Sequence, residues 1–235
     1  MLASAALCSA TFSLLLITQD PVKTNERPPA SEESIDRDLT RVKALLASGK
    51  ATADEVMASP EWSHLREKPR FRRAIREAAQ SPKTVIVPSD EPGTPLIVSG
   101  VVSDESAAPV AGAQVYVFQT SENGSYSTRG GNAANMGDSL NPRLFGYMIT
   151  GTDGRYEFRT IRPGQYPTNG PPAHIHYEVT APGFDKMVSE FMFEDDNRMS
   201  PETKEWAVES GFVVAAPEKG KDGVLRVTAN WTLPK

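Results

Sequence analysis

Apolar residues in the first third of the chain recur at helical spacing. Four of them fall on one face of a helix, and Gly49 follows as a stop signal: Ile35, Leu39, Val42 and Leu46. Two further helix starts lie downstream. Thr52 and Glu55 form the pattern of a capping box, and Ser59 directly precedes Pro60, which suits the first turn of a helix. The pattern predicts a helical segment over residues 34–82.

Four further apolar residues of this segment suit packing against a larger body: Trp62, Leu65, Phe71 and Ile75. A short amphipathic helix gains most of its stability from such packing. We therefore expect a packing role for the segment, in preference to a separate binding module. His64 also lies here, and we expect it to be an ordinary surface or packing histidine.

After a proline-rich linker, residues 83–95, the pattern changes to short strands separated by Gly, Pro and Asp. Asp153–Gly154 reads as the tight turn of a hairpin. The candidate strands are "LIVSGVV", "AQVYVFQT", "GYMIT", "RYEFRT", "HIHYEVT", "KMVSEFMF", "GFVVAA" and "VLRVTANWTL". Short strands in this number indicate an antiparallel sandwich or barrel. We expect a mainly β protein whose residues 96–235 form an antiparallel β-sandwich, preceded by the helical segment.

Length and charge limit the classes of function. A chain of 235 residues fits one main domain with additions. Its 30 acidic and 25 basic residues give a net charge of −5, and the basic residues form no block. We expect no nucleic-acid partner. A role with a small molecule remains open, and nothing in the pattern predicts an oligomeric state.

The first residues resemble a targeting segment. "MLASAALCSATFSLLLIT" carries no charge and contains an apolar run, and a polar linker follows at residues 21–33. We expect residues 1–20 to be a secretory signal peptide or an anchor, although no basic residue precedes the run. The protein would then be exported to the periplasm or secreted, and otherwise cytoplasmic. No other membrane contact is expected. Cys8 is the only cysteine, so disulfides give no sign of the compartment.

Two of the three histidines stand in one predicted strand. In "HIHYEVT", His174 and His176 point to the same face because side chains alternate along a strand, and Ile175 points to the other face. Two neighbouring imidazoles suit a metal ion. The alternative is a pair of surface histidines that happen to alternate.

Two tyrosines lie in predicted loops near other strand ends. Tyr166 stands eight residues before His174 in the proline-braced "TIRPGQYP", and Tyr126 follows "AQVYVFQT" in a loop rich in Gly and Ser. A loop tyrosine is most often a half-buried ring with its hydroxyl in water. The chain has no P-loop, no G-x-S-x-G elbow and no Cys/His zinc framework, which excludes several classes of enzyme.

Together these motifs resemble the intradiol ring-cleavage dioxygenases, the family of protocatechuate 3,4-dioxygenase and catechol 1,2-dioxygenase. The likeness covers about Leu96 to Glu194 and rests mainly on "TDGRYEFRTIRPGQYP" and "PAHIHYEV". The stretch "SGVVSDESAAPVAGAQVYVFQTSENGSY" adds less, because non-catalytic sandwiches share its opening. The resemblance implies one non-haem Fe(III) ion held by four protein ligands: Tyr126, Tyr166, His174 and His176. It further implies that Tyr126, His174 and a hydroxide are equatorial, and that Tyr166 and His176 are axial.

The resemblance also implies a reaction. Ferric iron would act as a Lewis acid on a catechol-type aromatic, whose ring O2 then opens between the two hydroxylated carbons to a cis,cis-muconate type diacid. Tyr166 would be the second axial ligand, displaced by the substrate, and would take up one of its protons. Two other readings stay open. One is a non-catalytic β-sandwich binding module, and the other is an iron-binding relative with lost or altered activity.

The chain departs from the family pattern at two positions. Pro171 stands three residues before His174, where the family usually has an arginine, and Glu190 stands where a glutamine is usual. Losing a cation that stabilises developing negative charge slows turnover. We therefore expect slow turnover and a preference for uncharged catechols. The arginines that could replace the missing cation are Arg129, Arg143 and Arg162, of which the last is expected to have a structural role.

Overall fold

The computed structural model of the chain describes residues 31–127 and 139–235. The expected signal or anchor at residues 1–20, most of the polar linker and Arg129 lie outside the described residues. None of the helices in the described part is long and apolar enough to cross a membrane.

Four helices follow one another at the start of the described chain: α1 (Glu32–Ala47), α2 (Ala53–Ala58), the 3-10 helix η1 (Pro60–Leu65) and α3 (Pro69–Ala78). The predicted caps are confirmed. The Thr52 side chain accepts from the Glu55 N–H while the Glu55 carboxylate accepts from the Thr52 N–H. Ser59 caps η1, with Pro60 in its first turn. Gly49 follows the end of α1, where the chain turns away.

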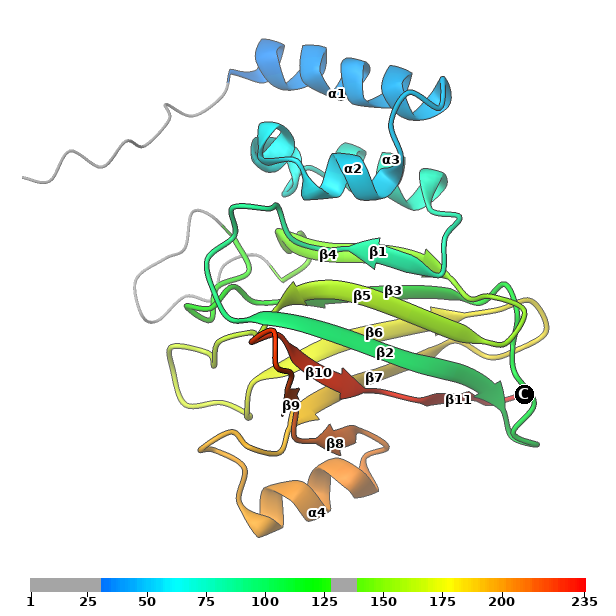
Figure 1. The fold of residues 1–235 in the computed structure, drawn as a ribbon, viewed down its shortest axis with the longest axis vertical. Coiled ribbons are helices and arrows are strands. Elements are labelled where there is room, and N and C mark those ends of the chain that lie inside the picture. The colour runs from blue at the N-terminus through cyan, green and yellow to red at the C-terminus, as the bar shows by residue number, and fades with distance from the viewer. Residues whose placement is uncertain (1–30, 128–138) are drawn as a thin grey trace, which may run out of the picture.

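The strands form two sheets that pack face to face, so the predicted mainly β sandwich is confirmed (Figure 1). One sheet has the order β1-β5-β2-β10-β9, with β11 also paired to β2, and the other has the order β4-β3-β6-β7-β8. The strands are β1 (Lys83–Val85), β2 (Pro95–Asp104), β3 (Gln114–Gln119), β4 (Leu144–Ile149), β5 (Arg155–Ile161), β6 (His174–Thr180), β7 (Met187–Phe193), β8 (Val213–Ala215), β9 (Glu218–Lys219), β10 (Leu225–Thr228) and β11 (Trp231–Leu233).

The sheets are mixed, which corrects the expectation of a wholly antiparallel fold. Four pairs run parallel, namely β1 with β5, β10 with β2, β11 with β2, and β7 with β8. Alternation of side chains reveals a strand but not the direction of its neighbour. The turn at Asp153–Gly154 is present, with φ 71° at Gly154. It joins strands of different sheets and closes no hairpin.

Three further details differ from the sequence expectation. Residues 83–95 are not only a linker, because β1 lies within them and pairs with β5. The last predicted strand is divided into β10 and β11, and between them Asn230 Oδ1 accepts from the Val101 N–H at 2.9 Å. A helix that was not expected, α4 (Pro201–Glu209), follows β7, and Ser200 caps it. Both strands of the divided pair still align with β2, so the chain keeps its place in the sheet.

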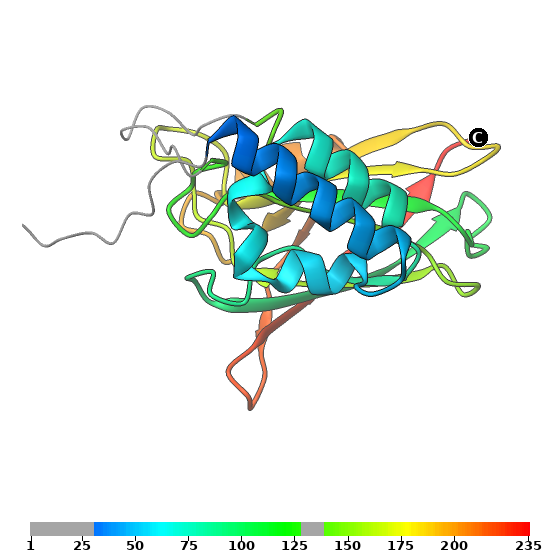
Figure 2. The same ribbon diagram turned by 90° about the horizontal axis from the view of Figure 1, so that it is seen from above.

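The helices α1 to α3 cover the end of the sandwich where the edge strands β1 and β4 lie (Figures 1 and 2). Their inner face forms one buried cluster with two residues of β4, Phe145 and Tyr147. Phe71 of α3 meets Phe145 edge to face, with ring centroids 6.4 Å apart. The predicted packing role is thereby confirmed. His64 lies in the same layer, where its Nε2 is 3.2 Å from Asp38 Oδ2.

We predict that Phe71→Ala lowers the free energy of unfolding by about 3 to 5 kcal/mol, because a fully buried ring is lost where the helices meet the sheet. Arg73→Ala removes an exposed side chain from the same helix and should change it by less than about 0.5 kcal/mol. Denaturant unfolding of both variants measures this. A loss below about 1 kcal/mol for Phe71→Ala would show that the helices are not anchored through this ring.

Candidate metal centre

The histidine pair lies in β6 with its side chains on one face. Ile175 and Tyr177 are buried in the core between the sheets, so His174 and His176 point to the outer face of the sheet. Their ring centroids are 4.7 Å apart and the rings are nearly perpendicular, at 85°. The predicted common face is confirmed. His174 is buried, with 6% of its surface exposed, whereas His176 is partly exposed.

The two loop tyrosines reach this histidine pair from different sides. Tyr126 follows β3 and Tyr166 follows β5, and their hydroxyl oxygens are 2.6 Å apart. Tyr126 Oη is 2.7 Å from His176 Nε2, and Tyr166 Oη is 2.8 Å from His174 Nε2. The structure therefore brings all four predicted residues together, with two phenol oxygens and two imidazole nitrogens in a continuous chain of contacts.

The second ring nitrogen of each histidine is occupied on the far side. His174 Nδ1 lies 2.8 Å from the Pro172 carbonyl oxygen. Because a carbonyl oxygen only accepts, Nδ1 must carry the proton and Nε2 keeps its lone pair for the site. His176 Nδ1 lies 3.2 Å from Glu190 Oε1. Both Nε2 atoms are thus directed at the tyrosines, which is the arrangement that metal-binding histidines use.

Two glycines let the tyrosine-bearing loops touch. A Cβ on Gly124 would lie 1.8 Å from the Gln165 carbonyl oxygen, and a Cβ on Gly164 would lie 2.0 Å from the Glu122 carbonyl oxygen. No side chain fits at either distance. The Gly164 N–H donates to the Ser121 carbonyl at 2.9 Å, which joins the loops directly. This close contact places Tyr126 and Tyr166 within hydrogen-bonding distance of each other.

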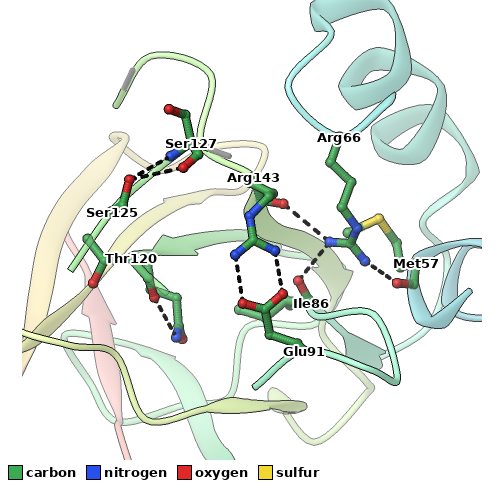
Figure 3. A network of polar contacts seen from close by, with 9 residues as sticks. Met57, Arg66, Ile86, Glu91, Thr120, Ser125, Ser127 and Arg143 are labelled. Carbon is green, nitrogen blue, oxygen red and sulfur yellow. Dashed lines mark hydrogen bonds and ion pairs between the residues drawn. The ribbon is translucent and has the colours of Figure 1, made fainter. Parts of the chain in front are cut away.

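A buried ion pair supports the backbone at Tyr126. The Arg143 N–H donates to the Tyr126 carbonyl at 2.7 Å. The guanidinium of Arg143 forms a two-armed ion pair with Glu91, whose side chain is only 3% exposed (Figure 3). The stretch that carries Tyr126 is therefore fixed to the residue directly before β4 and, through Glu91, to the segment that precedes β2.

A second arginine connects this support to the helices. Arg66 follows η1 and is fully buried, and its guanidinium donates to the carbonyls of Met57, Ile86 and Arg143 (Figure 3). Burial, and next the charge of Arg143, lower the pKa of Arg66 to about 9, so it stays a cation at neutral pH. Helix, strand and tyrosine loop meet at this one side chain.

Burial disfavours the charged forms of three residues of the centre, Tyr126, Tyr166 and His174. It raises the pKa of Tyr126, with a further contribution from the hydrogen bond to Tyr166, and it raises the pKa of Tyr166. Burial, and next the neighbouring His176, lower the pKa of His174. A bound metal ion reverses this for the phenols, since its charge favours the phenolates. Two phenolates and two neutral imidazoles fit ferric iron, which prefers hard anionic oxygen and accepts imidazole.

Glu190 lies beside the centre, opposite the tyrosines. It forms a group with His174 and His176 whose ligand atoms all lie within 4.8 Å of one another. However, Glu190 contacts Nδ1 of His176, and the tyrosines contact Nε2. Burial by itself would raise the pKa of Glu190, but the hydrogen bond with His176 and the charges of both histidines lower it. The carboxylate therefore supports His176 from behind.

Sequence reasoning missed one neighbour of the centre and left three arginines undecided. Phe118 stacks on the His176 ring, with centroids 4.4 Å apart and planes 12° apart. Arg143 forms an ion pair with Glu91. Arg162 forms a two-armed ion pair with Asp195 at 2.7 and 2.9 Å, which agrees with the structural role expected for Arg162. Arg129 lies outside the described residues.

Comparison with known proteins agrees with this geometry. A family model described as "Dioxygenase" matches residues 67–231. The chain is 32% identical over 138 residues to hydroxyquinol 1,2-dioxygenase of Rhizobium sp. (strain MTP-10005), and 29% identical over 174 residues to chlorocatechol 1,2-dioxygenase of Rhodococcus opacus. The structure of 3-chlorocatechol 1,2-dioxygenase from Rhodococcus opacus 1CP has the same fold, with a TM-score of 0.53 at 22% identity. The chain belongs to the family of intradiol ring-cleavage dioxygenases.

The matches differ in how much they cover. The hydroxyquinol 1,2-dioxygenase match covers 52% of this chain and 45% of that enzyme, and the chlorocatechol 1,2-dioxygenase match covers 66% and 65%. The structural match covers 86% of this chain and 96% of the Rhodococcus chain. The chain thus spans less than two thirds of the two curated relatives, while its fold extends over most of the solved one.

We predict that Glu91→Gln lowers the free energy of unfolding by about 3 to 5 kcal/mol, because Arg143 is left without its partner close to the second buried cation, Arg66. The Arg162–Asp195 pair is more exposed, so Asp195→Asn should cost only about 0 to 1 kcal/mol. Denaturant unfolding of the two variants compares these ion pairs. Equal losses would show that burial does not distinguish them.

Proposed function

We propose that the chain is a non-haem ferric dioxygenase that cleaves a catechol-type ring between its two hydroxylated carbons, with O2 as co-substrate. The observation that carries this proposal is the convergence of Tyr126, Tyr166, His174 and His176, whose donor atoms lie within 2.6 to 2.8 Å of their neighbours. The family to which the chain belongs and the names of its relatives support the same reaction.

The four residues would hold Fe(III) through two phenolate oxygens and two Nε2 nitrogens. When bound, the ion supplies a Lewis acid that holds both catechol oxygens and makes the ring reactive towards O2. The protein contributes ligand charge and orientation. Tyr126 and Tyr166 bring two negative charges that favour the ferric state, while Pro172 and Glu190 fix the tautomers of the two histidines.

The two tyrosines differ in exposure, and this difference supports different roles for them. Tyr126 is 2% exposed and its backbone is held by Arg143. Tyr166 is half-buried, and its carbonyl accepts from the Arg198 guanidinium at 3.1 Å. We assign to the more exposed phenol, Tyr166, the role of accepting a proton from an incoming catechol, and to the buried phenol, Tyr126, the role of a fixed ligand.

The charges near the centre favour an uncharged substrate. Glu190 places a carboxylate beside His176, and Arg143 and Arg162 both have acidic partners, whereas Arg198 donates to the Tyr166 carbonyl. Position 171 carries a proline where the family usually has a cation. A catechol without a carboxylate meets no repulsion here, and we propose catechols of this kind as the substrate class.

The iron prediction concerns the ligands. One equivalent of ferric iron should bind the purified wild-type chain and give a red-brown tyrosinate-to-iron charge-transfer band. His174→Ala and His176→Ala should each lose stoichiometric iron, because one protein ligand and the fixed geometry disappear together. Tyr126→Phe should weaken the band or shift it to shorter wavelength. Metal analysis and visible spectra measure these effects.

Two core tyrosines provide the control for that experiment. Tyr156 is buried and its hydroxyl donates to the Ala229 carbonyl at 2.6 Å, and Tyr177 is buried in the same core. Tyr156→Phe and Tyr177→Phe should leave the visible band unchanged. If both histidine variants keep full iron and colour, the ligand set is wrong. A band that survives Tyr126→Phe unaltered removes that tyrosine from the set.

The substrate prediction concerns the missing cation. Turnover should be slow, with catechol cleaved faster than its carboxylated analogue protocatechuate. Pro171→Arg should raise turnover by about 10- to 100-fold, because a positioned cation stabilises the negative charge that develops on the ring. Steady-state oxygen uptake with each substrate measures both effects.

A second arginine variant controls for the added charge. Asn169→Arg adds the same cation to an exposed position of the same loop and should leave turnover unchanged. Rapid cleavage of protocatechuate by the wild type would contradict the electrostatic argument and point to Arg129 or Arg198 as the replacement. Equal effects of the two arginine variants would show that position 171 has no special part.

A further inference from the structure

Three residues form a straight row across neighbouring strands on the outer face of the sheet. Phe118 of β3 is the direct partner of His176 in β6, and His176 is the direct partner of Glu190 in β7. Directly opposed residues in adjacent strands bring their side chains within contact distance. The imidazole of His176 therefore has an aromatic ring on one side and a carboxylate on the other, and both are placed by backbone pairing.

The contacts in this row determine the ring plane and the tautomer of His176. Stacking on Phe118, at 4.4 Å and 12°, sets the plane of the ring. The carboxylate of Glu190, 3.2 Å from Nδ1, sets the tautomer, because an ionised carboxylate can only accept and Nδ1 must then donate. Nε2 is left as the donor atom for the centre, where Tyr126 Oη is 2.7 Å away.

A carboxylate does more than a neutral amide at this position. An amide oxygen fixes the tautomer, but a carboxylate also draws the Nδ1 proton towards itself and gives the imidazole more negative character. The ring then becomes a stronger electron donor through Nε2. This electron donation adds to the donation from the two phenolates. It strengthens the binding of a highly charged ion, and it weakens the electron-withdrawing effect of that ion on its ligands.

We propose that Glu190 is a positioning residue that acts through His176 and tunes the proposed iron centre towards a tightly bound, less oxidising ferric ion. The inference rests on the proposed function, since it concerns how the same centre is adjusted. It adds a specific role for the carboxylate that β7 places directly opposite His176.

Two other roles for Glu190 are weaker. As a direct ligand it would have to share an ion with Nδ1 of His176, and that nitrogen faces away from the tyrosines. As an ordinary surface ion pair it would be largely exposed, yet its side chain is only 23% exposed and that of His176 only 22%. Strand pairing places Glu190 directly opposite His176, and its partly buried side chain brings the carboxylate to Nδ1.

The test compares Glu190→Gln with Glu178→Gln in the ferric protein. Glu178 lies two residues beyond His176 on the same face of β6 and pairs with Lys186 at 2.6 Å. Its substitution removes the same charge nearby without touching the His176 ring. For each protein the iron affinity is measured by chelator competition, the charge-transfer band by visible spectroscopy and the reduction potential by spectroelectrochemistry.

Glu190→Gln should weaken iron binding by about 10- to 100-fold, the range usual for loss of a group behind a metal ligand. It should also move the charge-transfer band to longer wavelength and raise the reduction potential, because the ion pulls harder on the tyrosinates when His176 donates less. Glu178→Gln should leave all three readings at the wild-type values.

The outcomes separate the inference from the proposed function. If the wild type itself takes up no iron and shows no band, the proposed function fails. If the wild type is coloured but Glu190→Gln matches it in affinity, band and potential, the proposed role of Glu190 is overturned while the function stands. If both variants shift the band equally, the effect is one of general charge and the inference through His176 is wrong.

Discussion

The contact between the two tyrosine-bearing loops is the constraint on which the centre depends. Gly124 and Gly164 each lie so close to the backbone of the other loop that a Cβ would overlap a carbonyl oxygen, at 1.8 and 2.0 Å. Only this approach lets Tyr126, from the loop after β3, meet Tyr166, from the loop after β5. Strand β6 then supplies both imidazoles from a single face, and no further element has to converge.

The helical layer at the end of the sandwich is connected to the same centre. Arg66 donates to the Arg143 carbonyl, and the N–H of Arg143 donates to the Tyr126 carbonyl. Glu91 holds the side chain of Arg143. The stability of the helices, of the segment before β2 and of the rigid tyrosine is therefore shared. The centre combines one buried phenol, Tyr126, with one half-buried phenol, Tyr166.

Local patterns in the sequence predicted much of this structure. The capping box at Thr52 and the alternation around Ile175 give the helix start and the common face of the histidines, because both follow from nearest neighbours along the chain. The same kind of signal, an N-cap serine directly before a proline, marks the start of α4 at Ser200 and Pro201. The pairing of His176 with Glu190 also follows from the sequence once the turn between β6 and β7 is placed at Gly183, because both residues lie seven positions from that glycine. The directions of neighbouring strands and the contacts of Arg66 could not be predicted in this way, because they depend on residues far apart in the sequence.

The central claim is that four side chains hold ferric iron so that O2 opens a catechol ring between its hydroxylated carbons. The most direct measurement adds isotopically labelled O2 to the iron-loaded protein after anaerobic binding of catechol, followed by mass analysis of the product. The account predicts a cis,cis-muconate type diacid that contains both labelled oxygen atoms. Absence of ring cleavage, or a product opened beside the two hydroxylated carbons, would contradict it.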